Sequence, residues 1–250
     1  MTTTSKQPRN AIESARRTIE LELRAVEQLQ HRIDESFTHA VELLSAVKGR
    51  VIVSGMGKSG HIGNKIAATL ASTGTPAQFV HPAEACHGDM GMITRSDAAL
   101  LMSNSGTTAE ITALLPLLKR LGLPIVAMTG NPDSTLARAA DAHLNISVDE
   151  EACPLDLAPT ASTTANLVMG DALAIAMLEQ SGFTAEDFAF THPGGALGRR
   201  LLTRVSDVLV TGSDIPKVSL TMSLADALME ISAKGLGMST VVDNNDRLLG

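Results

Sequence analysis

Between residues 51 and 180, short β-rich runs alternate with helical stretches, and this alternation constrains the fold more than any other feature. The β-rich runs span residues 51–55, 77–80, 98–103, 124–130 and 143–148. The helical stretches span residues 60–72, 108–121 and 160–180. Strands that alternate with helices form right-handed βαβ units around a parallel sheet, which predicts an α/β domain. Ligands of such sheets bind at the carboxyl ends of the strands, so we expect the functional site there.

The segments on either side of this alternation have different patterns. Apolar residues from Ile12 to Leu44 recur every three or four positions, which predicts one or two long amphipathic helices. These helices could pack on the main domain or form a contact between subunits. After residue 200, a predicted helix at 223–234 and a strand at 239–243 indicate the start of a second small domain, which we expect the end of the sequence to truncate. We therefore predict three parts, at residues 1–48, 49–203 and 204–250.

Composition argues against several classes of protein. Apolar residues make up 44% of the chain, enough for a sizeable core, but there is no run of about 18 apolar residues. We therefore predict no membrane span, and the N-terminus has no secretory signal pattern, so we expect a cytoplasmic protein. A net charge of −7 without a long basic run argues against nucleic acid as a partner. Cys86 and Cys153 form no CxxC pair, so we expect two reduced thiols.

A glycine-rich turn follows the first predicted strand, in the sequence VIVSGMGKSG at residues 51–60. The helix that starts there offers free N–H groups and a partial positive charge, which suit a phosphate. A Walker A loop is excluded because Ile52 stands where its first glycine is required. The glycine spacing fits GxGxxG, but residues 79–81, at the end of the second strand, include no carboxylate for a dinucleotide ribose. NAD binding is therefore an alternative with little support.

Two further motifs follow predicted strands. The sequence SNSGTTAE at residues 103–110 brings hydroxyl groups and backbone amides to a helix start, which suits phosphate recognition, although such a cluster can be only a helix cap. The segment from His81 to Asp89 holds two histidines, a cysteine and two carboxylates. Histidine suits acid–base chemistry near neutral pH. These side chains can also bind zinc, but their spacing matches no closed structural zinc site.

Six motifs together resemble the SIS (sugar isomerase) domain, and specifically the arabinose 5-phosphate isomerase family, over about residues 11 to 200. In order they are GMGKSGHIG, HPAEACHGDMG, SNSGTTAE, EACPLDLAPTASTT, GDALA and THPGGALGR. Thr107 departs from the family, whose members commonly carry Glu there, whereas Glu110 is retained. The tail from Val205 resembles the first half of a CBS (cystathionine β-synthase-type) module.

The resemblance implies a five-stranded parallel sheet in flavodoxin-like order, flanked by helices and assembled as a homo-oligomer, a tetramer. It implies that the substrate is a small sugar phosphate. The implied reaction interconverts D-ribulose 5-phosphate and D-arabinose 5-phosphate through an enediol, for the Kdo sugar of lipopolysaccharide. No cofactor is required by this chemistry, and any zinc is not expected to be catalytic. A SIS domain that senses a sugar phosphate without catalysis is the alternative.

The resemblance also assigns candidate site residues. The catalytic candidates are Lys58, His87, Glu110, Glu151 and His192. The substrate-binding candidates are Ser54, Ser59, Gly74, Thr75, Ser103, Ser105, Gly106 and Thr108, and the metal candidate is His81. Glu110 and Glu151 are candidate bases, because burial can raise the pKa of a carboxylate toward neutrality. Lys58 could stabilise the enediolate or bind the phosphate, while His87 and His192 suit proton transfer at oxygen, with His192 supplied by another subunit.

Overall fold

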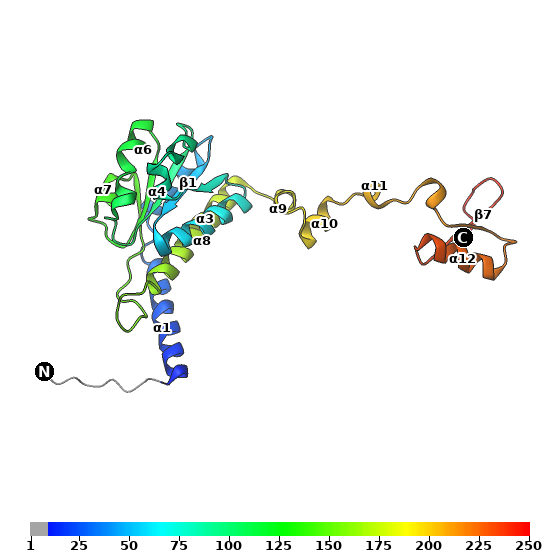
Figure 1. The fold of residues 1–250 in the computed structure, drawn as a ribbon, viewed down its shortest axis with the longest axis horizontal. Helices are drawn as coiled ribbons and strands as arrows, with labels where there is room; N and C mark the ends of the chain where they lie inside the picture. The colour runs from blue at the N-terminus through cyan, green and yellow to red at the C-terminus, as the bar shows by residue number, and fades with distance from the viewer. Residues whose placement is uncertain (1–9) are drawn as a thin grey trace. The chain divides into compact units, whose positions relative to one another are not determined.

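The computed structural model describes residues 10–250, apart from the side chains of residues 196 and 197, so residues 1–9 of the predicted N-terminal part lie outside it. The described chain divides into two compact units, one ending at His192 and the other beginning at Pro193 (Figure 1). This division falls ahead of the predicted boundary at residue 203, so the segment 193–203 belongs to the second unit.

A five-stranded parallel sheet forms the centre of the first unit, with the strand order β2-β1-β3-β4-β5 that the resemblance implied. Its strands are β1 (Val51–Gly55), β2 (Ala77–Phe79), β3 (Ala98–Met102), β4 (Ile125–Thr129) and β5 (Ala142–Asn145). Every residue of β1, β3 and β4 is buried, which explains their largely apolar sequence. The strand order reverses between β1 and β3, and the loops that follow these two strands form the crevice where α/β domains bind ligands.

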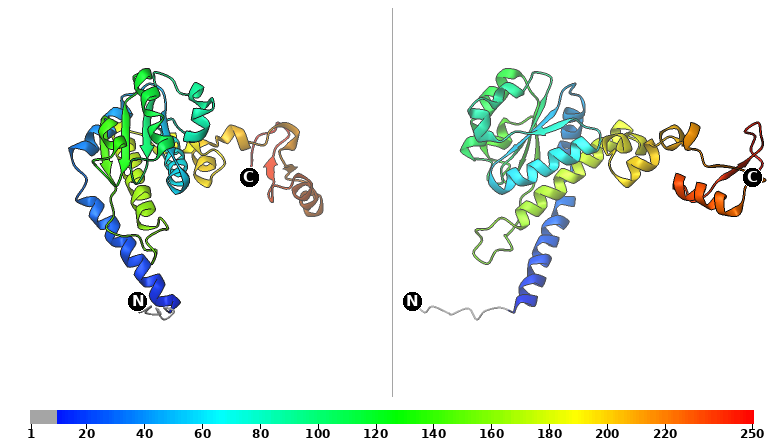
Figure 2. Two further views of the ribbon diagram at one scale, coloured as in Figure 1. Left: turned by 60° about the vertical axis from the view of Figure 1, so that its left-hand side comes forward. Right: turned by 45° about the vertical axis from the view of Figure 1, so that its right-hand side comes forward.

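Helices cover both faces of the sheet (Figure 2). One face carries α2 (Glu35–Ser45), α3 (Gly57–Ser72) and α8 (Ala161–Ser181). The other carries α4 (Pro82–Cys86), α5 (Ala109–Thr112), α6 (Leu115–Leu121) and α7 (Thr135–Ala139). The single helix predicted over 108–121 is wrong, because Pro116 occupies the first turn of a new helix, where its missing N–H costs nothing. A short 3-10 turn, Asp89–Met92, follows α4.

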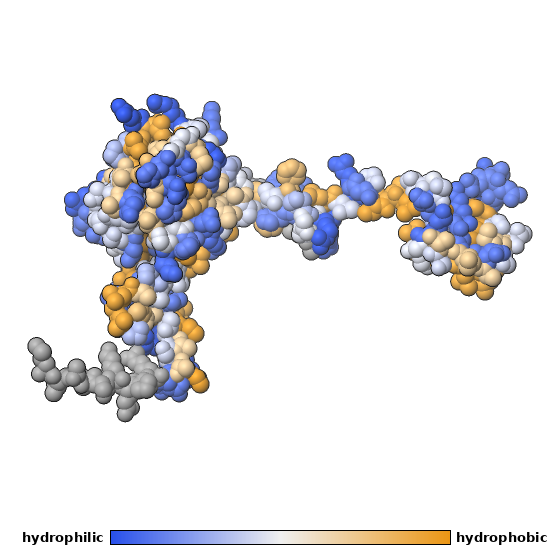
Figure 3. Space-filling model, viewed as in Figure 1, coloured by the Kyte–Doolittle hydropathy of each residue, from blue (hydrophilic) through white to orange (hydrophobic). Residues whose placement is uncertain are grey.

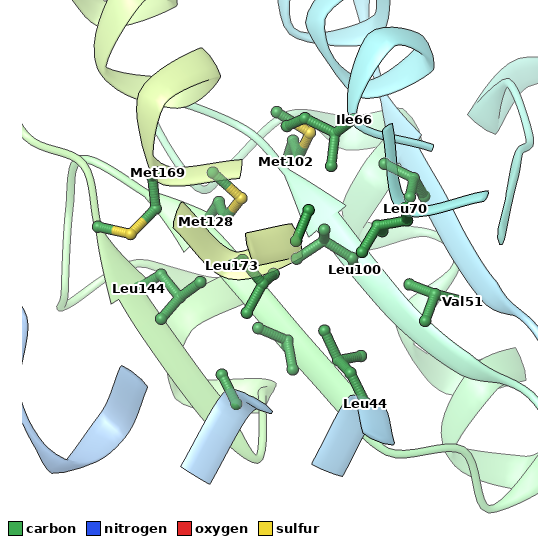
Figure 4. Close-up of a cluster of buried hydrophobic side chains, with 14 of the residues drawn as sticks. Leu44, Val51, Ile66, Leu70, Leu100, Met102, Met128, Leu144, Met169 and Leu173 are labelled. Atoms are coloured by element: carbon green, nitrogen blue, oxygen red, sulfur yellow. The ribbon is translucent and has the colours of Figure 1, made fainter. Parts of the chain in front are cut away.

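The larger core lies between the sheet and the helices α2, α3 and α8 (Figure 4). Leu44, Ile66, Leu100 and Leu173 meet there, and each side chain is at most 1% exposed. By length and composition α8 could cross a membrane, but half of its most apolar stretch is buried within the protein, where it packs against α1 (Ala11–Gln30) and α3. It therefore serves here as the core helix of the α/β unit.

Two N-terminal helices precede the sheet, as predicted, with α1 spanning Ala11–Gln30 and α2 following it. Leu21, Ala25 and Leu29 of α1 are buried, and α1 packs against α8. Ile19 and Leu23, which the periodicity placed in one apolar stripe with Leu29, are 67% and 56% exposed. Figure 3 shows apolar atoms at the surface near α1, and the exposed Ile19 and Leu23 belong to a part of the helix that the described chain leaves uncovered.

The second unit contains a two-stranded parallel sheet. Its elements are α10 (Ala196–Leu202), α11 (Val205–Val208), a 3-10 turn (Gly212–Asp214), β6 (Lys217–Ser219), α12 (Leu224–Lys234) and β7 (Thr240–Val242). The predicted helix at 223–234 and the predicted strand near 239–243 are therefore both present. The resemblance of this unit to a CBS module stays a prediction.

Candidate active site

The loops after β1 and β3 lie side by side at the carboxyl edge of the sheet. The register pairs Gly55 at the end of β1 with Met102 at the end of β3. The chain then enters α3, whose second residue is the exposed Lys58, with Ser59 partly buried beside it. The other loop begins at Ser103, so the two predicted phosphate-binding motifs end neighbouring strands.

Ser103 organises the loop after β3. Its side chain is buried, and its Oγ lies 2.7 Å from Thr108 Oγ1 and accepts a hydrogen bond from the Gly106 N–H at 3.1 Å. Gly106 has a φ of 66°, and a Cβ added there would lie 2.0 Å from Ser134 Oγ. Glycine is therefore required at this position both by its backbone conformation and by the close approach of Ser134.

The outer part of the same loop remains open to solvent. Ser105 is exposed, and its Oγ accepts hydrogen bonds from the backbone N–H and the hydroxyl of Thr107 at 3.3 and 3.2 Å. The loop therefore presents hydroxyl and N–H donors of the kind that bind an anion. Sequence reasoning missed Ser134, which packs under this loop and caps α7. The turn signal Asn-Pro-Asp-Ser after β4 could have identified it.

The start of α8 lies beside the start of α3. The two helices pack along each other (Figure 2), and Lys65 of α3 forms an ion pair with Asp171 of α8. Lys58 lies about two turns before Lys65 in α3, and Thr164 lies about two turns before Asp171 in α8, so both are equally far from the ion pair. The first turn of α8 is therefore level with the glycine-rich turn after β1.

Glu151 binds to the first turn of α8. Its Oε2 accepts hydrogen bonds from the Thr160 N–H at 2.7 Å, the Thr160 hydroxyl at 2.9 Å and the Ser162 N–H at 3.3 Å. Partial burial raises the pKa of Glu151, but the hydrogen bonds from Ser162 and Thr160 outweigh it and lower the pKa below its ordinary value. The net pKa of this candidate base is therefore lowered, whereas we expected from the sequence that burial would raise it toward neutrality.

Glu110 and His87 lie on the other side of the β3 loop. Glu110 is the second residue of α5, shortly after Thr108, and it is exposed, so the buried carboxylate that the mechanism anticipated is absent at this position too. His87 directly follows α4 and is also exposed. Because α4 packs against α5, both side chains belong to the loop cluster at the carboxyl edge.

His81, the predicted metal ligand, follows β2 at the same edge of the sheet. Its Nδ1 is buried without a hydrogen-bond partner in the described structure. Within residues 10–250, no three His, Cys, Asp or Glu side chains are arranged to hold a metal ion. Zinc sites in proteins generally use at least three such ligands, so the residues around His81 do not fit one.

Three predicted substrate-binding residues do not face the strand-end loops. Ser54 is buried, and its hydroxyl donates to the Val80 carbonyl at 2.7 Å, so it ties β1 to the end of β2 and is not available to a substrate. Gly74 and Thr75 precede β2 and therefore lie at the amino edge, where the Val51 N–H donates to the Pro76 carbonyl. At roughly 3.3 Å per residue, the length of β1 separates them from the candidate site by about 13 Å or more.

His192 also lies away from Lys58 within one chain. It follows α9 (Ala185–Thr191) and stacks on Phe188, with ring centroids 4.0 Å apart. The Thr191 hydroxyl reaches the carbonyl of Ser72, the last residue of α3, at 3.5 Å. The length of α3 from Lys58 to Ser72 is about 21 Å at 1.5 Å per residue. The predicted residues therefore form two groups, one at each edge of the sheet.

A cleft of about 320 Å³ lies beside the β3 loop, between Asn104 and the segment that carries Glu151. Leu157 and Pro159 form part of its wall. Its acidic lining residues are Asp149, Glu150, Glu151 and Asp156. An open, acidic cleft of this kind suits the hydroxyl groups of a sugar better than its phosphate, because like charges repel.

Comparisons with known proteins identify relatives of this chain. The SIS domain family matches residues 43–176. Arabinose 5-phosphate isomerase KdsD of Pseudomonas aeruginosa is 65% identical over 239 residues, which cover 96% of this chain and 73% of that protein. The same enzyme of Escherichia coli K12 is 56% identical over 238 residues, 95% of this chain and 73% of that one. A solved Escherichia coli CFT073 protein in complex with arabinose 5-phosphate is 43% identical, with a TM-score of 0.71, and the match covers 77% of this chain and 100% of that chain.

Proposed function

Because this chain belongs to the SIS-domain family of arabinose 5-phosphate isomerases, we propose that it interconverts D-ribulose 5-phosphate and D-arabinose 5-phosphate. One observation carries the proposal on chemical grounds: hydroxyl and N–H donors end two neighbouring parallel strands, β1 and β3. The same relatives favour the isomerase over the sensor and the NAD-dependent alternatives. The supply of Kdo for lipopolysaccharide and a cytoplasmic location belong to this proposal.

The phosphate binds the loop at 103–108 and the start of α3, where Lys58 supplies a positive charge. Neutral hydroxyl and backbone donors can hold a dianion there without any further ion pair. The sugar carbons extend toward the cleft beside Asn104, whose carboxylates would repel the phosphate. Binding energy from the phosphate orients the reacting carbons.

The reaction moves one proton between C1 and C2 of the sugar. A base removes a proton from one carbon, the enediol forms, and the proton returns to the neighbouring carbon, so no external oxidant or reductant is consumed. The carbonyl already acidifies the C–H bond, so we propose that no organic cofactor and no metal is needed. Lys58 can also stabilise the negative oxygen of the enediolate.

Glu110 is the carboxylate that best suits the role of base. Glu151 is held by the first turn of α8, and its lowered pKa makes it a weaker base than an ordinary glutamate. We assign Glu151 a structural role: it closes the loop at residues 151–160 by accepting hydrogen bonds from Thr160. His87 then serves proton transfer at the substrate oxygens from the end of α4.

A second copy of the chain completes the site. His192, Gly74 and Thr75 lie at the edge of the sheet opposite Lys58, so one chain cannot bring all of them to one substrate. The Nδ1 of His192 lies 3.0 Å from the Phe188 carbonyl, which can only accept a hydrogen bond. The proton is thereby held on Nδ1, and Nε2 can exchange a proton with a substrate bound to another subunit of the homo-oligomer, which we take to be a tetramer.

An NMR assay in deuterated water with D-ribulose 5-phosphate tests the function and the assignment of the base. The wild type should form D-arabinose 5-phosphate that carries deuterium at C2. Glu110→Gln should lower turnover at least about a hundredfold. Glu151→Gln should cost about tenfold, and Glu13→Gln, an exposed carboxylate in α1, should match the wild type.

The outcomes separate the two claims. Stabilisation by the sugar phosphate without any product would refute the isomerase and favour a sensor. Formation of product with a larger loss in Glu151→Gln than in Glu110→Gln would keep the isomerase and reverse the assignment of the base.

A further inference from the structure

We propose that α1 is a positioning element of the active site, in which Arg17 holds the backbone next to Glu151 in place. This inference rests on the proposed function, in which Glu151 closes the loop beside the substrate. It concerns a helix outside the loops that the function uses.

One face of α1 contacts the segment that leads from β5 to Glu151. Three side chains of the helix, and Arg32 just beyond its last residue Gln30, meet successive parts of this segment. The spacing of seven and four residues places the three helical side chains on one face. The contacts are Arg17 to the Ala152 carbonyl at 2.7 Å, Arg24 to Glu150 at 3.3 Å, Gln28 to Asp149 at 2.6 Å, and Arg32 to the Ser147 carbonyl. The helix therefore follows the segment for most of its length.

Arg17 is the one of these four that connects to the Glu151 carboxylate. The Ala152 carbonyl accepts its hydrogen bond, and the Ala152 N–H donates to Thr160 Oγ1 at 2.8 Å. The Thr160 hydroxyl in turn donates to Glu151 Oε2 at 2.9 Å. Both peptide groups of the buried Ala152 are thus fixed by hydrogen bonds. Through them the Glu151 carboxylate, which closes the loop, is also held in position.

A second contact ties α1 to the other partner of Glu151. Glu22 Oε2 accepts a hydrogen bond from Thr164 Oγ1 at 2.9 Å, near the start of α8. The helix α1 therefore holds both the segment that carries Glu151 and the helix start that binds its carboxylate. Arg17 is partly buried, and within residues 10–250 its buried Nε has no hydrogen-bond partner, which lowers the contribution of this side chain to stability.

Turnover of three single variants tests the role of Arg17. Arg17→Ala should lower kcat about tenfold and change KM less than about twofold, since a hydrogen bond from a charged donor is worth about that factor. Arg17→Lys, which can still reach the carbonyl, should recover most of the loss. Arg16→Ala, an exposed neighbour on the same helix, should match the wild type. A kcat of Arg17→Ala within twofold of the wild type would overturn the inference.

A double-mutant cycle identifies the residue through which Arg17 acts. In a Glu151→Gln background, Arg17→Ala should change kcat less than about twofold, because the group that it positions is gone. If the kcat losses of the two single variants multiply in the double variant, Arg17 acts through a group other than Glu151.

Hydrogen exchange gives a readout that needs no activity. The Ala152 and Thr160 amides should exchange at least about tenfold faster in Arg17→Ala than in Arg16→Ala. Unchanged exchange would overturn the positioning role whatever the turnover, whereas a wild type without turnover but with this exchange pattern would refute only the proposed function.

Discussion

Replacing Gly106 with alanine tests whether the loop after β3 is fixed by close packing. The added Cβ would lie 2.0 Å from the Ser134 Oγ and 2.3 Å from its Cβ, far inside contact distance. Ser134 caps α7 by accepting from the Ala137 N–H at 3.2 Å, so it cannot move away without losing this bond. Gly122 offers a matched control, because its φ of 78° is also left-handed but nothing lies within 4 Å of the Cβ position.

Three contributions add at Gly106 and one at Gly122. A left-handed conformation costs a residue other than glycine about 1–2 kcal/mol. Overpacking costs about 1–3 kcal/mol, and a lost helix cap costs about 1 kcal/mol. We therefore expect Gly106→Ala to lower the free energy of unfolding by about 4 kcal/mol and Gly122→Ala by about 1.5 kcal/mol. For a unit of this size, these values correspond to falls in Tm of about 12 °C and about 4 °C.

Thermal unfolding monitored by circular dichroism measures both variants. Adding Ser134→Gly to Gly106→Ala removes the clashing atoms, while glycine is tolerated at a helix cap, so the double variant should regain about half of the lost Tm. The displaced loop should also raise KM for the sugar phosphate in the single variant. A Tm for Gly106→Ala no lower than that of Gly122→Ala would refute the packing argument.

Three further predictions test other parts of the first unit. Ser54→Ala should change KM less than twofold and lower the free energy of unfolding by about 1 kcal/mol, because the hydroxyl donates to the Val80 carbonyl and does not bind the substrate. A fivefold rise in KM would show that Ser54 contacts the substrate. Burial raises the pKa of Asp97, but two backbone N–H groups at 2.7 Å outweigh it and lower the pKa. Asp97 thus stabilises the fold above its unfolded pKa of about 3.9 and loses this effect as the pH falls through its lower folded pKa. Asp97→Asn should therefore lower Tm at pH 7 by an amount that shrinks below about pH 4, and a pH-independent difference would contradict this. Backbone N–H groups, that of Ala158 first, lower the pKa of the Cys153 thiol. Iodoacetamide should therefore label Cys153 faster than it labels free glutathione at pH 7, and this difference should disappear above about pH 9. Mass spectrometry measures the labelling, and slower labelling of Cys153 than of glutathione would refute the prediction.

The sheet could be predicted from the sequence because its strands are short, mostly apolar and alternate with helical stretches. Elements of four or five residues, such as α4 and α7, were missed because they are too short to show a helical period. The break between α5 and α6 was visible at Pro116, since proline cannot continue a helix from the preceding turn. Local rules thus account for most of the fold.

The candidate site was predictable only where the chain order decides position. Residues directly after β1 and β3 had to meet, because the carboxyl ends of parallel strands share one edge. Gly74 and Thr75 precede a strand, so the same rule places them at the opposite edge, although the motif resemblance grouped them with the rest. The bonds between Glu151 and α8 depend on tertiary packing, which no sequence pattern expressed.

The separation of Lys58 from His192 within one polypeptide has a genetic consequence. A chain that lacks the lysine and a chain that lacks the histidine fail for different reasons, and each still carries what the other has lost. In the homo-oligomer proposed above, in which a second copy supplies His192, two such inactive alleles expressed in the same cell should assemble mixed oligomers with some complete catalytic centres. Complementation between two null alleles of one gene would then be expected, as a direct result of how this sheet distributes its chemistry between its two edges.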